Sequence, residues 1–273
     1  MKGKHFKKNE IHFFRKALIL ILAIIFIISL VVIIFWLKSN IQLSKIEKEV
    51  IEQVVTENNE ESEEKKGSIS VDFQKLSEIN SDVIGWIYIK NTDINYPIFQ
   101  TDDNEYYLKR DIYKNYSSCG SIFLDCNSNI DFSDDNTIIY GHNLKNQKMF
   151  ADLAKIYNGE LGESIEIEIY LKTQVKIYEV ITSYEEEPNL EIIERNFKEN
   201  GKEEYINKNM EKSKVKFKYT ASLTNNIITL VTCDSTGKNR IVVTAVEKIW
   251  HKKSIEKVRI ITYYSINKIR LIS

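Results

Sequence analysis

Residues 227–246 read IITLVTCDSTGKNRIVVTAV, and this stretch holds two β-rich runs on either side of a polar loop. Ile227 to Thr232 and Ile241 to Val246 consist mainly of Ile, Val, Leu and Thr, which favour extended strands. The segment between them is short, polar and contains a glycine, as hairpin loops do. We therefore expect two neighbouring antiparallel strands.

Six further runs of the same kind lie upstream and are separated by turn residues. They are Val83 to Ile89, Ile94 to Phe99, Ser121 to Leu124, Thr137 to Tyr140, Ser164 to Ile169 and Val175 to Ser183. Many short strands with regular turn signals are typical of sandwiches and barrels. We predict a mainly β fold in which eight strands form a closed, or nearly closed, barrel.

Three helical patterns accompany the predicted strands. Asp72 can cap a short helix before the first strand, with apolar residues at three- and four-residue spacing. A second pattern covers Gln147 to Ile156, and a third, rich in charge, covers Glu191 to Lys214. The third is a helical insertion before the strand that leads to Cys233.

The N-terminal region carries a membrane-span signal. Ala17 to Leu37 are 21 consecutive residues without a charge, and at about 1.5 Å per residue they cover roughly 30 Å of hydrocarbon. The chain continues through Phe35-Trp36-Leu37-Lys38 without the small-residue site of a cleaved signal peptide. We expect a retained anchor. Six basic residues precede it and predict that the N-terminus stays inside the cell: Lys2, Lys4, Lys7, Lys8, Arg15 and Lys16.

These signals divide the chain into five parts. Residues 1–16 are a basic cytoplasmic N-terminus, 17–37 the anchor, and 38–70 an extracellular stalk that includes eight glutamates between Ile41 and Lys66. Residues 71–248 form the folded domain, and 249–273 a basic C-terminal tail. The composition of the tail favours an added strand or a mobile segment over contact with an anionic membrane or wall polymer.

The near-neutral overall charge does not favour nucleic acid as a partner. The chain has 38 Lys and Arg against 39 Asp and Glu, a net charge of −1. Proteins that bind nucleic acid usually carry a basic surface. At 273 residues and 43% hydrophobic composition, the chain can instead bury a sizeable core.

Three cysteines are present, and we expect none to form a disulfide. If the run between Cys119 and Cys126 is extended, their Cα atoms lie about 23 Å apart, whereas a disulfide needs less than about 7 Å. Cys233 stands alone at the end of a predicted strand. An isolated thiol in an exported chain is a candidate nucleophile, although a buried, inert cysteine is the commoner situation.

Cys233 has two suitable partners. His142 is the only histidine within the predicted folded domain, and it follows the strand that ends at Tyr140. Arg240 starts the strand after Cys233, and a closed hairpin would place the two residues about 5 Å apart. Attack on an amide needs a thiolate, an oxyanion donor and an acid for the leaving amine. Cys233, Arg240 and His142 can supply these three functions.

The sequence around these residues resembles the sortase family. Thr229-Leu230-Val231-Thr232-Cys233, with Arg240 seven residues later, resembles the TLxTC motif, and Tyr140-Gly141-His142-Asn143 resembles the GHN motif. Further likeness covers about residues 72–248, through segments 82–87, 95–98, 103–108 and 120–125. The helix before the first strand and the helical insertion between Tyr184 and Lys214 resemble class B members.

This resemblance implies a sortase-type barrel and a transpeptidase. It implies cleavage of a C-terminal sorting signal after threonine, a thioester on Cys233, and transfer of a surface protein to an amine of a cell-wall precursor. Tyr140 and Thr232, which neighbour the motif residues, are expected to line the substrate groove. Val231 stands where class B members often carry serine, so a hydroxyl contact to the signal is absent.

No metal or cofactor is expected. Glu185-Glu186-Glu187 could suggest calcium, but three consecutive carboxylates do not all face one ion, and a solvated loop accounts for them. Two alternatives to a transpeptidase stay open. One is a wall-hydrolysing cysteine peptidase, although papain-like enzymes place cysteine before histidine in the chain. The other is a non-catalytic surface-binding module.

Overall fold

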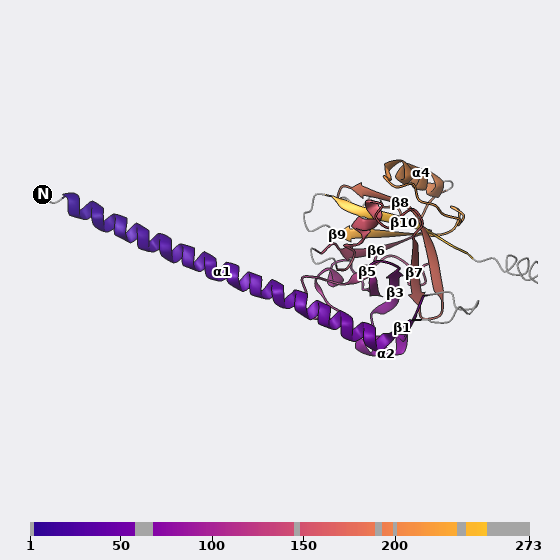
Figure 1. Ribbon diagram of the computed structural model, residues 1–273, viewed down its shortest axis with the longest axis horizontal. Coiled ribbons are helices and arrows are strands. Elements are labelled where there is room, and N and C mark those ends of the chain that lie inside the picture. The colour runs from indigo at the N-terminus through magenta and orange to yellow at the C-terminus, as the bar shows by residue number, and fades with distance from the viewer. Residues whose placement is uncertain are drawn as a thin grey trace, which may run out of the picture.

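The computed structural model describes residues 3–57, 68–144, 148–188, 193–198, 201–233 and 239–249. Almost all of the predicted tail and part of the predicted stalk lie outside these residues. The first element is a single 52-residue helix, α1 (Gly3–Val54), which leads away from the rest of the chain as a long rod (Figure 1). Its segment His12–Lys38 is long and apolar enough to cross a membrane.

The folded domain is a closed eight-stranded barrel, as predicted, with strand order β10-β8-β7-β3-β4-β5-β6-β9. Every predicted strand is present, with ends that differ by no more than a few residues. The strands are β3 (Val83–Ile89), β4 (Asn95–Phe99), β5 (Ile122–Leu124), β6 (Asn136–His142), β7 (Glu166–Leu171), β8 (Val175–Glu186), β9 (Ile227–Cys233) and β10 (Arg240–Glu247).

Alternating side chains fill the barrel and cover its outside. Ile87, Ile139 and Leu230 belong to an inner cluster, and all three are fully buried. Their neighbours Trp86 and Val231 face outward and join a second cluster with the end of α1 and the helix α2 (Phe73–Ile79). Strands buried on both faces are apolar at nearly every position, which explains the continuous hydrophobic runs in the sequence.

The start of the folded domain differs from the prediction. Val50 and Val54, in the predicted stalk, are buried against the barrel. The chain continues as β1 (Val55–Glu57), which pairs with β2 (Ile69–Val71) in an antiparallel ribbon. The folded unit therefore begins about twenty residues before Val71, because the last turns of α1 carry an apolar face among the glutamates.

The helices are shorter than predicted, apart from α2, where Asp72 accepts a hydrogen bond from the Lys75 amide as expected. Met149 has a φ of 57°, which excludes it from a right-handed helix, so α3 covers only Leu153–Tyr157. In the insertion, α4 covers Gly201–Lys212 and lies on the side of the barrel away from the end of α1 (Figure 1). A 3-10 helix, η1 (Tyr106–Lys109), was not predicted.

The acidic run Glu185–Glu187 also differs from its predicted loop. Glu185 and Glu186 lie in β8, opposite Ile241 and Arg240 of β10, and Glu186 forms an ion pair with Lys212. Within the described part of the chain, no three potential ligand side chains are placed to hold a metal ion.

Candidate active site

Backbone pairing brings the three predicted catalytic positions together at one end of the barrel. β6 and β9 are parallel neighbours, and in their register His142 is the partner of Cys233. β9 and β10 are antiparallel, with Val231 opposite Val242. Continued by two residues, that register puts Arg240 opposite Cys233. Because neighbouring strands lie about 4.8 Å apart, Cys233 stands between the other two. For Cys233, the structure describes the backbone only.

The His142 ring is held by a backbone carbonyl. Its Nε2 lies 2.7 Å from the carbonyl oxygen of Leu108, a residue of η1. A carbonyl oxygen can only accept a hydrogen bond, so Nε2 carries a hydrogen. The ring is only partly buried. The other nitrogen, Nδ1, is therefore the one that can exchange a proton with a substrate or with a thiol.

Gly120 packs directly against the same ring. Its φ is +60°, and a Cβ there would come within 2.8 Å of His142 Cδ2, 2.7 Å of the Leu108 oxygen and 2.8 Å of the Tyr107 oxygen. Only glycine fits such a conformation at such close approach. The loop from Leu108 to Gly120 thus contacts the imidazole with both of its ends.

Arg240 lies against the backbone just before Cys233. Its Nη1 donates to the Thr232 carbonyl at 3.4 Å, and its Nε donates to the Pro188 carbonyl at 3.4 Å. The guanidinium of arginine is a planar cation with several N–H donors. A positive charge fixed beside this strand end can stabilise a thiolate or an oxyanion.

Tyr140 and Thr232, which were expected to line a groove, are both buried. Tyr140 is 5% exposed and donates to Asp125 at 3.1 Å. Thr232 is 1% exposed, and its hydroxyl accepts from the Ile241 amide at 3.0 Å. Both side chains belong to the barrel wall, so their contact with substrate stays a prediction that the burial does not favour.

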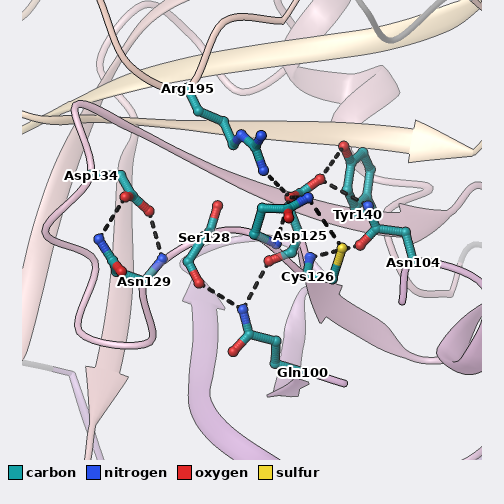
Figure 2. A network of polar contacts seen from close by, with 10 residues as sticks. Gln100, Asn104, Asp125, Cys126, Ser128, Asn129, Asp134, Tyr140 and Arg195 are labelled. Atoms are coloured by element: carbon teal, nitrogen blue, oxygen red, sulfur yellow. Dashed lines mark hydrogen bonds and ion pairs between the residues drawn. The ribbon is translucent and has the colours of Figure 1, made fainter. Parts of the chain in front are cut away.

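A polar network behind the site was not predicted (Figure 2). At its centre is Asp125, a buried residue that follows β5. Arg195, from the helical insertion, donates to its carboxylate at 2.9 Å, and Asn104 donates at 2.9 Å. Burial alone would raise the pKa of Asp125, but the hydrogen bonds and the Arg195 charge outweigh it and lower the pKa. The network ties the insertion to the strand that carries His142, through Tyr140.

Sequence reasoning missed Asp125, Leu108 and Gly120 as parts of the site. Leu108 acts through its carbonyl, which no side-chain pattern reveals. Gly120 and Asp125 lie in segment 120–125, which did contribute to the family resemblance. Cys119 and Cys126, which flank that segment, form no disulfide with any residue that the structure describes.

Comparison with known proteins gives one consistent result. The family model described as the sortase domain matches residues 87–248. Sortase B of Listeria monocytogenes is 36% identical over 172 residues, covering 62% of this chain and 70% of that protein. The crystal structure of Clostridium perfringens sortase B superposes with a TM-score of 0.60 at 31% identity, covering 65% of this chain and all of that one. A Staphylococcus aureus sortase B–substrate complex superposes with a TM-score of 0.59 at 28% identity, covering 66% of this chain and 85% of that one.

Proposed function

The chain belongs to the sortase family as a class B member and is a cysteine transpeptidase, and on this basis we propose that Cys233 is its nucleophile, His142 its proton carrier and Arg240 its oxyanion donor. The observation that carries this assignment is the register, in which Cys233 is paired with His142 on one side and is opposite Arg240 on the other. Cys119 is buried and lies outside the paired strands.

The first half-reaction forms a thioester. The Cys233 thiolate attacks the carbonyl carbon of the scissile peptide, and the negative charge that develops on the carbonyl oxygen is stabilised by the Arg240 guanidinium. Collapse of this intermediate breaks the C–N bond, and the leaving nitrogen takes a proton from Nδ1 of His142. The Leu108 carbonyl, which occupies Nε2, supports this choice of nitrogen.

The second half-reaction returns the enzyme to its starting state. An acceptor amine attacks the thioester carbonyl and gives its proton to His142. The C–S bond breaks, and the thiolate is regenerated together with a new amide. Water in place of the amine would give hydrolysis, so transpeptidation depends on the amine reaching the site first.

We further propose the substrate classes that the family resemblance implies. The donor is a surface protein with a C-terminal sorting signal, cleaved after threonine, and the acceptor is an amine of a cell-wall precursor. The basic residues before the apolar part of α1 favour a single-pass anchor with residues 1–16 inside and the barrel outside the cell.

The test is an assay of the full chain in detergent with sorting-signal peptides, with and without an amine acceptor. We expect amine-dependent product and a peptide adduct on Cys233 detected by mass spectrometry. Cys233→Ala should remove both, while the matched thiol controls Cys119→Ala and Cys126→Ala should keep them. A product whose yield does not depend on the amine would indicate a hydrolase. No adduct with any peptide would indicate a binding module.

A further inference from the structure

An exposed aromatic loop lies next to the catalytic end of the barrel. Outside α1, only four large apolar side chains of the described residues are exposed: Tyr113, Tyr116, Ile130 and Ile249. Two of these four lie within four residues of each other, on the segment between η1 and β5. Exposed aromatic side chains that gather in one place commonly mark a contact surface.

Hydrogen bonds of Asp111 and Arg110 fix the conformation of the loop that carries these tyrosines. The Asp111 carboxylate is buried and accepts the amides of Tyr113 at 3.0 Å and Asn115 at 2.9 Å. Arg110 donates to the Lys114 carbonyl at 3.1 Å and forms a β-bridge with Tyr116. These hydrogen bonds hold the loop in a defined turn, on which Tyr113 and Tyr116 are exposed.

A ring contact gives the position of this loop relative to the membrane anchor. The Tyr116 ring lies 6.4 Å from that of Phe35 in α1. Phe35 is in the last turn of the uncharged run that ends at Leu37, and Trp36 and Lys38 are its neighbours. Aromatic residues with a polar atom prefer the boundary between hydrocarbon and water. The loop therefore lies at the level where α1 leaves the hydrocarbon.

We propose that the loop of residues 111–116 rests in the phospholipid headgroup region of the membrane that α1 crosses, with Tyr113 and Tyr116 as its interfacial contacts. This inference depends on the anchoring stated in the proposed function. The exposed Lys109 and Lys38 flank the contact and are compatible with an anionic surface.

The contact would also fix the distance between the active site and the membrane surface. The loop of residues 111–116 lies between Leu108, whose carbonyl holds His142, and Gly120, which packs on the same ring. Docking of the loop therefore places the catalytic imidazole close to the lipid surface. A site in this position suits donors and acceptors that are themselves held in the membrane by apolar segments or chains.

The test uses the full chain in phosphatidylglycerol nanodiscs, with the photo-crosslinking residue p-benzoylphenylalanine in place of Tyr116, Tyr113 or Ile130. Ile130 is a matched control, since it is 60% exposed against 61% for Tyr116 and lies in the loop that leads into the opposite end of β6. After illumination, we expect phospholipid adducts several-fold more abundant at 113 and 116 than at 130. The second position covers the case in which a probe at 116 reacts with α1.

Equal adduct yields at all three positions, or none at 113 and 116, would overturn the proposal. Co-elution of the chain with nanodiscs, and cleavage of a soluble sorting-signal peptide, report separately on the anchor and on the enzyme. These readouts distinguish a failure of the lipid contact from a failure of the proposed function. The tyrosines have no place in the proposed chemistry, so peptide cleavage should be unchanged in the substituted chains.

Discussion

Replacing Gly120 by alanine should damage both stability and catalysis, because the new Cβ meets the catalytic histidine. A left-handed φ costs a non-glycine residue about 1–2 kcal/mol. Contacts below 3 Å with Leu108, Tyr107 and His142 add an overpacking cost of about 1–3 kcal/mol. We expect a loss of about 2–5 kcal/mol in total, and displacement of the ring from the Leu108 carbonyl.

Gly162→Ala provides a matched control. Gly162 has a φ of +83°, and a methyl group added there would have nothing within 4 Å, so this variant carries the backbone cost without the contacts. At about 2–4 °C per kcal/mol for a domain of this size, the control should lower Tm by about 2–8 °C, and Gly120→Ala by about 4–20 °C. Changes in the entropy of the unfolded chain are the same for both and cancel in the comparison.

The assay is thermal unfolding of both variants, followed by peptide cleavage at a temperature where both are folded. Gly120→Ala should lower kcat, whereas Gly162→Ala should leave it unchanged. The reasoning would be refuted if Gly120→Ala were no less stable than the control, or if it were folded and fully active. Either result would mean that the loop can move away from His142 without cost.

Three further predictions concern charged residues. Glu179 is buried, which would raise its pKa, but hydrogen bonds from Lys248 and from the Thr220 and Ala221 amides lower the pKa to about 2. The ionised carboxylate therefore stabilises the fold above the usual pKa near 4.5, and this stabilisation is lost as the pH falls toward 2. Glu179→Gln should flatten that part of the acid-unfolding curve, and an unchanged curve would contradict this. Arg195→Met should destabilise the domain by about 1–3 kcal/mol by leaving Asp125 without its ion pair, measured by urea unfolding, with Arg195→Lys restoring part of the loss. Arg240→Lys should lower kcat by about 10²–10³ with a smaller change in KM, because an ammonium lacks the planar donor fork; equal changes in both constants would count against an oxyanion role.

The strands could be predicted from the sequence because each is a short run rich in apolar, β-branched or aromatic residues, bounded by turn residues. The burial of the end of α1 against the barrel could not be predicted in this way. Val50 and Val54 stand among glutamates, and their apolar face has meaning only once the barrel wall beside it is known. The many glutamates between Ile41 and Lys66 predict solvent exposure for the region as a whole, and they give no sign that Val50 and Val54 are buried.

The closeness of Cys233 and Arg240 could be predicted from the sequence, but the contacts that support the candidate site could not. Cys233 and Arg240 are close in the chain, so a hairpin argument sufficed. The Asp125–Arg195 pair joins residues 70 positions apart, and the hydrogen bond from His142 goes to a main-chain oxygen. Such contacts depend on how loops cross the barrel end, which local patterns do not specify.

The position of β9 has a consequence for how the protein becomes active. The hairpin of β9 and β10 is the last part of the barrel in the chain, and it fills the gap between β6 and β8. A chain that has been synthesised only as far as β8 contains His142 but does not yet contain the Cys233 thiol. Long-range pairings of this kind form late in folding. Acyl transfer can therefore begin only after the domain is complete, and reactive intermediates cannot form on a half-made protein.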